Sequence, residues 1–305
     1  MAASSLRVIC GPTAAGKSAL ALRLAERFGA VVICADSRQI YRGFDIGTAK
    51  PSAAERARVP HRGIDILDPT ERYSAARWAS DAERWIAEAE DAGTVPMVVG
   101  GTGLYIRSLV TPLFEEPDLD AHRRHDLATL LASHDIAGLR RWCGVLDPRR
   151  AHLGRTQLLR AIEVALLSGR RLSDLHEGTP RAPRVAARYL VVDPGAALAA
   201  RIERRVLAMV DAGWADEARQ LAQWVPDDAP AWKASGYGVA RRLARGEIMA
   251  GAAIEAIVIE TRQYAKRQRT WFRNQLPAAD VTRIDPGDAD AERIAQRWWT
   301  GEGSA

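Results

Sequence analysis

GPTAAGKS, residues 11–18, follows the apolar run Leu6–Cys10 and precedes a helix-like segment, residues 19–28. This stretch fits the pattern G-x-x-x-x-G-K-[ST] in the strand, loop and helix context that the pattern requires. Its glycines let backbone N–H groups close on phosphate oxygens, and the following helix end adds partial positive charge. Lys17 supplies a cation, and Ser18 supplies a hydroxyl for a metal ion such as Mg²⁺. The stretch predicts a pyrophosphate or polyphosphate site, whether or not the phosphate belongs to a nucleotide such as ATP.

The composition is that of a globular protein. With 305 residues and 47% hydrophobic content, the chain can form one large or two ordinary domains. No run of apolar residues approaches the roughly 20 that cross a bilayer, and the start does not resemble a secretory signal, so we expect a cytoplasmic protein with no membrane partner. Three cysteines without C-x-x-C spacing argue against a disulfide framework or a zinc site. A net charge of +5 makes an anionic macromolecule a plausible partner.

Short apolar runs indicate buried parallel strands at residues 8–10, 31–35, 95–99 and 190–192, with a closing strand near 281–284. Helix-like segments separate them, which predicts an α/β fold with a P-loop NTPase-like parallel sheet. Residues 117–178 instead contain Arg-rich, Leu-spaced helices and no strand candidate. We therefore expect three segments: an α/β core over residues 1–116, an inserted helical subdomain over 117–180, and the rest of the core with basic C-terminal helices over 181–305.

Two polar loops follow predicted strands at the sheet edge where ligands of open α/β folds bind. Asp36 ends the second strand, where a carboxylate can coordinate magnesium through water, accept a proton from a nucleophile, or merely cap the following turn. The third strand runs into Gly100-Gly101-Thr102-Gly103, whose backbone can approach a ligand closely. A nucleotide hydrolase commonly has a magnesium-binding Asp at such a strand end. Asp193 can still supply that acid, so ATP use stays open.

The segment 261–273 carries five cations and no acidic residue, with aromatic residues interleaved. At helical spacing Arg262, Lys266, Arg269 and Arg273 share one face, which suits a phosphodiester backbone. The alternative is a solvated basic helix whose aromatic residues pack in the core. Pairs of arginines in the helical insertion, at 123–124, 140–141, 149–150 and 170–171, favour nucleic acid.

Taken together, residues 11–18, 36–51 (DSRQIYRGFDIGTAKP), 100–105 and 266–273 resemble the tRNA dimethylallyltransferase family, bacterial type. The similarity extends nearly from end to end, and the block at 36–51 is its most specific part. The chain departs from the family pattern at Arg62, at residues 152–156 and at Ser235. The alternatives are a P-loop small-molecule kinase that uses ATP, which leaves the basic helix unexplained, and a non-catalytic RNA-binding protein, which leaves Asp36 and Thr102 without a role.

The resemblance implies transfer of a dimethylallyl group from dimethylallyl pyrophosphate to N6 of the adenosine 3′ of the anticodon, position 37, in tRNAs that read UNN codons. In that reaction Asp36 accepts the N6 proton, Thr102 orients the substrate, and Lys17 stabilises the leaving group together with Mg²⁺ held by Ser18. We also expect a monomer that flips the target base out of the anticodon stem-loop. The resemblance assigns pyrophosphate to Gly11, Pro12, Thr13, Ala14, Ala15, Gly16, Lys17 and Ser18. It assigns tRNA to Asp36, Ser37, Arg38, Gln39, Thr102, Arg123, Arg124, Gln157, Leu158, Leu159, Arg160, Ala161, Gly236, Tyr237, Lys266, Arg267, Arg269, Trp271 and Arg273.

Overall fold

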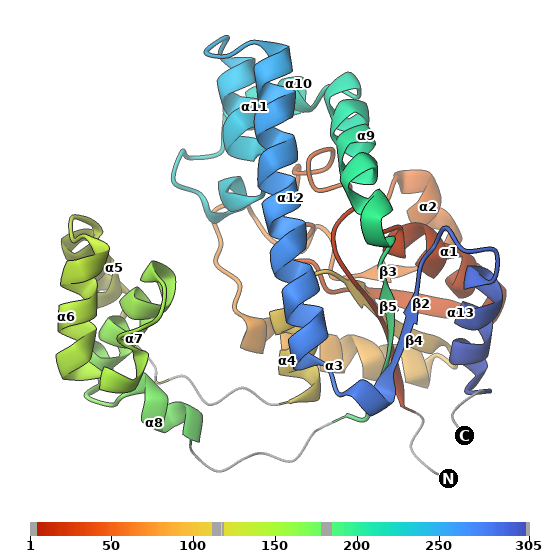
Figure 1. The fold of residues 1–305 in the computed structure, drawn as a ribbon, viewed down its shortest axis with the longest axis horizontal. Coiled ribbons are helices and arrows are strands. Elements are labelled where there is room, and N and C mark those ends of the chain that lie inside the picture. The colour runs from red at the N-terminus through yellow and green to blue at the C-terminus, as the bar shows by residue number, and fades with distance from the viewer. Residues whose placement is uncertain (1–4, 112–116, 118, 178–184, 303–305) are drawn as a thin grey trace. The chain divides into compact units, whose positions relative to one another are not determined.

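The chain folds into two compact units (Figure 1). A computed structural model describes residues 5–111, 117, 119–177 and 185–302. The first unit joins residues 1–111 to residues 183–305, and the second consists of residues 112–182. Within the described residues, no helix is both long enough and apolar enough to cross a bilayer.

The first unit is built on a six-stranded parallel sheet, which confirms the predicted α/β class. The strand order is β3-β2-β4-β1-β5-β6. Because β1 lies between β4 and β5, the loop that follows it stands at the middle of the carboxyl edge, where ligands of open α/β sheets bind. The strands are β1 Leu6–Cys10, β2 Ala30–Cys34, β3 His61–Arg62, β4 Val95–Gly100, β5 Ala187–Val192 and β6 Val281–Ile284.

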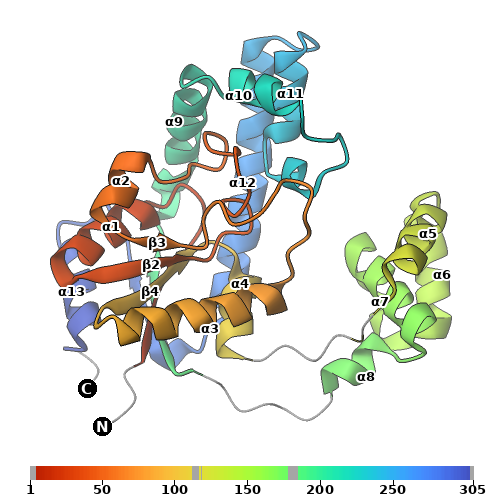
Figure 2. The same ribbon diagram turned by 180° about the vertical axis from the view of Figure 1, so that it is seen from behind.

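Helices cover both faces of this sheet (Figure 2). On one face, α1 (Lys17–Phe28) and α13 (Ala291–Thr300) pack against alternate side chains of the strands, around Ile9, Leu24 and Trp298. On the other face, α3 (Ala75–Asp91) and α4 (Gly103–Val110) bury Trp78 and Tyr105 against the remaining side chains. The two-residue strand β3 was not predicted, because its residues are polar and form no apolar run.

A second layer of helices lies beyond the carboxyl edge of the sheet. It contains α2 (Ala53–Arg58), α9 (Leu198–Asp211), α10 (Trp214–Leu221), α11 (Tyr237–Ala244) and the long helix α12 (Ala250–Gln275). Trp214 and Tyr237, both almost fully buried, form part of the core that joins α9 to α12 and to the loop around Phe44. This layer forms a roof over the end of β1.

The second unit is helical in its described part and has its own core. Its helices are α5 (Ala121–Ala132), α6 (Ile136–Leu146), α7 (Arg155–Ser168) and α8 (Leu172–Glu177). Leu139, Leu158 and Ile162 are fully buried among them. The fully buried Asp147 accepts a hydrogen bond from the backbone N–H of Ser173 (2.9 Å), which connects the start of α8 to the end of α6.

Candidate active site

The phosphate loop has the backbone conformation that its sequence predicts. Gly11 and Gly16 have φ values of 142° and 99°, which disfavour any residue with a Cβ atom. A Cβ at Gly11 would also lie 2.2 Å from the carbonyl oxygen of Val192. The loop therefore needs glycine both for its turn and for close packing against the end of β5. Nζ of Lys17 donates a hydrogen bond to the carbonyl oxygen of Pro12 (2.6 Å), which holds the ammonium over the loop.

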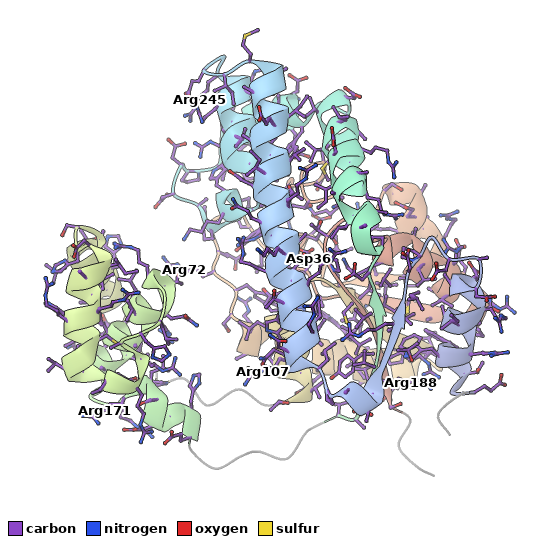
Figure 3. All side chains as sticks on the ribbon, viewed as in Figure 1. Asp36, Arg72, Arg107, Arg171, Arg188 and Arg245 are labelled. Carbon is purple, nitrogen blue, oxygen red and sulfur yellow. The ribbon has the colours of Figure 1, made fainter. Side chains whose placement is uncertain are left out.

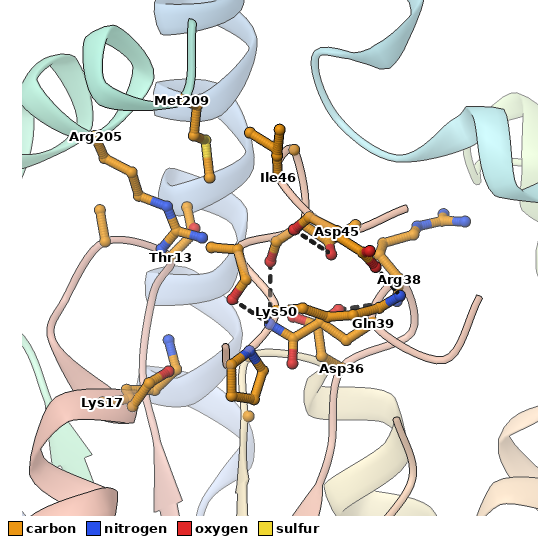
Figure 4. A pocket seen from close by; sticks show the side chains of 18 of the residues that line it. Thr13, Lys17, Asp36, Arg38, Gln39, Asp45, Ile46, Lys50, Arg205 and Met209 are labelled. Atoms are coloured by element: carbon orange, nitrogen blue, oxygen red, sulfur yellow. Dashed lines mark hydrogen bonds and ion pairs between the residues drawn. The ribbon is translucent and has the colours of Figure 1, made fainter. Parts of the chain in front are cut away.

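The loop opens into a cavity of about 980 Å³ beneath the helical roof. Lys17, Asp36 and Arg205 line it, together with residues of the loop at 45–50 (Figure 4). Burial lowers the pKa of Lys17 to about 8. The charge of Arg205 contributes to the lowering and that of Asp36 opposes it. An unpaired ammonium in such surroundings is stabilised by an anion.

Two arginines of α9 join Lys17, and our sequence analysis missed both. Arg201 donates from Nε to the carbonyl oxygen of Ala14 (3.0 Å), within the phosphate loop. Arg205, one turn later, makes no hydrogen bond or ion pair within the described residues, and Figure 4 shows it pointing into the cavity toward Lys17. Burial lowers the pKa of Arg205 as well. The i, i+4 spacing of two arginines just after a strand end was the available sequence signal.

Asp36 and Thr102 lie together beside this cationic group. One carboxylate oxygen of Asp36, Oδ1, accepts a hydrogen bond from the N–H of Arg38 (2.8 Å), so Asp36 does cap its turn. The other oxygen makes no hydrogen bond within the described residues, which leaves it available to a ligand in the cavity. Thr102 Oγ1 accepts from the N–H of Ser37 (3.1 Å), and the N–H of Thr102 donates to the carbonyl oxygen of Ala35 (3.1 Å). The two loops are thus fixed to each other.

Tyr264, on α12, belongs to the same group, although our sequence analysis gave it no place in the site. Its side chain lines the cavity and lies near Thr102 and Asp36, which both influence its pKa. Burial, with a further contribution from the charge of Asp36, raises the pKa of Tyr264 to about 12, so its hydroxyl is protonated at neutral pH. Arg267 covers the ring, with its guanidinium carbon 5.7 Å from the ring centroid.

The sequence block at 36–51 forms a rim that is held in place from several sides. Nε2 of Gln39 donates to the carbonyl oxygens of Thr48 and Ala49 (3.0 Å each). Glu217 of α10 accepts from the N–H groups of residues 45 and 46 (3.0 and 2.6 Å), and also from the hydroxyl of Tyr237 (2.5 Å). A Cβ at Gly47 would lie 2.2 Å from Trp214. Much of this block therefore serves to shape the cavity.

The predicted basic stripe on α12 is interrupted by ion pairs. Arg269 binds Asp193 and the carbonyl oxygen of Gly195, and Arg262 lies 3.5 Å from Glu203. The pairing with Arg269 also occupies Asp193, the acid that left ATP use open. Trp271 packs against Gly103, where a Cβ would come within 2.3 Å of the indole. The exposed cations that remain on this helix are Lys266, Arg267 and Arg273. Figure 3 labels two further arginines near the ends of this helix. Arg107 belongs to α4, and Arg245 lies between α11 and α12.

The other residues that the resemblance assigned to tRNA lie in several different environments. Arg38 is partly exposed and donates to the carbonyl oxygen of Pro230 (3.3 Å). In the second unit, Arg123 and Gln157 are exposed, Leu159 is half-buried, and Arg124 and Arg160 both bind Glu163.

Three of these assignments need correction. Leu158 and Ala161 are fully buried in the core of the second unit, and Tyr237 is fully buried in the first, so their side chains cannot reach RNA. Gly236 has a structural role too, since its N–H binds Glu260 (3.0 Å) and a Cβ there would lie 2.3 Å from Trp214.

Comparisons with known proteins agree with this geometry. A sequence profile described as IPP transferase matches residues 39–275, and one described as isopentenyl transferase matches residues 4–61. The tRNA dimethylallyltransferase of Deinococcus radiodurans is 38% identical over 97% of this chain and 98% of its own length. That of Rhodospirillum centenum is 44% identical over 92% of this chain and 91% of its own.

Solved structures show the same relationship. The tRNA isopentenylpyrophosphate transferase of Bacillus halodurans is 34% identical, with a TM-score of 0.68 over 98% of this chain and 96% of that one. A eukaryotic dimethylallyltransferase, described as acting on tRNA, is 25% identical, with a TM-score of 0.80 over 97% of this chain and 79% of that one. The sequence similarity and the fold lead to the same assignment: the chain belongs to the tRNA dimethylallyltransferase (IPP transferase) family.

Proposed function

We propose that this enzyme transfers the dimethylallyl group of dimethylallyl pyrophosphate to N6 of adenosine 37 in tRNAs that read UNN codons. The observation that carries the proposal is the convergence in one cavity of the phosphate loop, Arg205 and Asp36, with Thr102 bound to the neighbouring Ser37. An anion site lies beside a carboxylate and two hydroxyl groups, which is what a transfer from a pyrophosphate to a weakly basic amine requires.

The donor half of the site acts on the leaving group. Loop N–H groups, Lys17 and Arg205 stabilise the negative charge that develops on pyrophosphate as the bond from C1 to oxygen breaks. Ser18 is exposed in the cavity and its hydroxyl makes no hydrogen bond within the described residues, so it suits a magnesium ion that is otherwise held by phosphate oxygens and water. That ion would add positive charge at the same oxygens. The described residues include no cluster of three or more His, Cys, Asp or Glu side chains arranged to hold a metal ion.

The acceptor half of the site acts on adenine. The free oxygen of Asp36 accepts the proton of N6 as the bond from N6 to C1 forms, because an exocyclic amine is a poor nucleophile while it keeps that proton. Thr102 and Tyr264 place two hydroxyl groups beside the same carboxylate and orient the base. The cavity lies inside the unit, so the base must leave its stack to enter. Lys266, Arg267 and Arg273 face solvent on α12 and suit the RNA backbone. We propose that the enzyme works as a monomer in the cytoplasm.

Incubation with Mg²⁺, radiolabelled dimethylallyl pyrophosphate and unmodified tRNA carrying adenosine 37, followed by nucleoside analysis, tests the proposal. We expect label in N6-dimethylallyladenosine, and none when adenosine 37 is replaced by guanosine. Phosphate transfer or hydrolysis with ATP, and no label from the allylic donor, would support a kinase instead. RNA binding without either reaction would indicate a binding protein.

A further inference from the structure

Gln268 is a buried polar side chain that the proposed mechanism does not use. It lies on α12 and is 7% exposed. Its Oε1 accepts a hydrogen bond from the N–H of Thr13 in the phosphate loop (2.8 Å), and its Nε2 donates to the carbonyl oxygen of Gly101 (2.8 Å). Only this orientation of the amide satisfies both partners, since one is a donor and the other an acceptor.

Three neighbouring residues of α12 contact three different loops at the carboxyl edge of the sheet. Gln268 joins the phosphate loop to the loop after β4, Arg269 binds the loop after β5, and Trp271 packs on Gly103. The space around Gln268 is tight, because a Cβ at Gly101 would lie 2.4 Å from its Nε2. The amide therefore sets the distance between the phosphate loop and the backbone that leads directly to Thr102.

That distance matters for the transfer reaction. The phosphate loop fixes the leaving group and hence C1 of the donor, whereas Thr102 and Asp36 fix the attacking nitrogen. In-line attack requires reacting atoms about 3–3.5 Å apart, and a displacement of about 1 Å can reduce the rate on the order of 100-fold. The hydrogen bond from Thr13 also shows that its N–H is committed to Gln268, so this amide is not available to phosphate.

We infer that Gln268 is a positioning residue for catalysis: it holds the pyrophosphate loop and the Thr102 loop at the spacing that aligns the allylic donor with the acceptor base. This inference rests on the proposed function. Gln268→Glu tests it with almost no change in shape, because one carboxylate oxygen still accepts from Thr13 while the other faces the carbonyl oxygen of Gly101 and repels it. Gln268→Met tests the loss of both hydrogen bonds with the packing largely kept.

Single-turnover kinetics on preformed enzyme–tRNA complexes gives the rate per active site, and a titration of active sites gives the folded, competent fraction. We expect both variants to lose about 10- to 100-fold in that rate. The dissociation constant for tRNA should stay within about threefold of the wild-type value in both variants, and so should that for inorganic pyrophosphate in Gln268→Met, which adds no charge beside the loop. The matched control is Gln263→Glu, the same substitution at an exposed position of the same helix, which should retain the wild-type rate.

Three outcomes would overturn the inference. One is a wild-type rate per active site in the Gln268 variants. Another is a loss that appears only as a smaller competent fraction or a lower melting temperature, which indicates a purely structural role. The third is a loss explained entirely by weaker pyrophosphate binding, which would make Gln268 part of the binding site. If the wild-type enzyme itself forms no product, the proposed function fails instead, and the pyrophosphate affinities still report on the loop.

Discussion

The lowered pKa of Lys17 predicts that the donor affinity of the free enzyme depends on pH. With a pKa of about 8, about a tenth of the Lys17 side chains are neutral at pH 7 and about nine tenths at pH 9. Pyrophosphate binds the charged form, so raising the pH through about 8 removes affinity, and binding at high pH must take up a proton. The expected dissociation constant of dimethylallyl pyrophosphate rises about tenfold between pH 7 and pH 9.

Neighbouring titratable groups with a shifted pKa do not change charge in this pH range. Burial raises the pKa of Cys34 far above its ordinary value and that of Tyr264 to about 12, and it lowers the pKa of His61 below its ordinary value, so none of the three titrates between pH 7.5 and 9.5. The terminal phosphate of the donor, with a pKa of about 6, is already ionised. Lys17 is therefore the group that we expect to titrate.

Isothermal titration calorimetry without tRNA measures both quantities, since titrations in buffers of different ionisation enthalpy report the proton uptake. We expect uptake to rise from about 0.1 proton at pH 7 to about 0.9 at pH 9. Lys17→Arg is the control, because an arginine stays charged throughout and should flatten the pH dependence. A wild-type affinity that changes less than twofold between pH 7.5 and 9.5 with no proton uptake would refute the reasoning. So would an unchanged pH dependence in Lys17→Ala.

Three further substitutions separate catalysis, donor binding and stability. Asp36→Asn should lower the single-turnover rate about 10²- to 10⁴-fold while tRNA affinity in a filter-binding assay stays within threefold; an unchanged rate would exclude Asp36 as the base. Arg205→Met should weaken pyrophosphate binding by about 1.5–3 kcal/mol in calorimetry, and wild-type affinity would show that its guanidinium does not reach the ligand. Glu217→Gln should lower the free energy of unfolding in urea by about 2–3 kcal/mol, because it disturbs an acceptor of the loop at 45–47. The exposed neighbour Asp216 is its control, and an equal loss in Asp216→Asn would contradict the structural role of Glu217.

Local features of the chain were predictable from the sequence because short-range physical constraints determine them. The phosphate loop needs glycine at two positive-φ positions, and its helix begins within the motif. The sequence of eight consecutive residues therefore determines most of the loop's backbone conformation. Five of the six strands were predicted from apolar runs, since buried parallel strands are hydrophobic on both faces. Strand β3 was not predicted because it consists of two polar residues, and only its pairing with β2 makes it a strand.

Only the tertiary structure decided which distant residues meet at the end of β1. Thr13 binds Gln268 across 255 positions of sequence, and Arg205 reaches the cavity from a helix that begins after the fifth strand. The predicted stripe on α12 had the right helical spacing, but packing against β5 and α9 gave two of its arginines acidic partners. Spacing along one element determines which face a residue occupies, whereas strand order and helix packing determine what that face meets. The sequence alone thus identified a phosphate loop and the family resemblance, and the fold alone assembled the donor cations, the carboxylate and the amide that connects them.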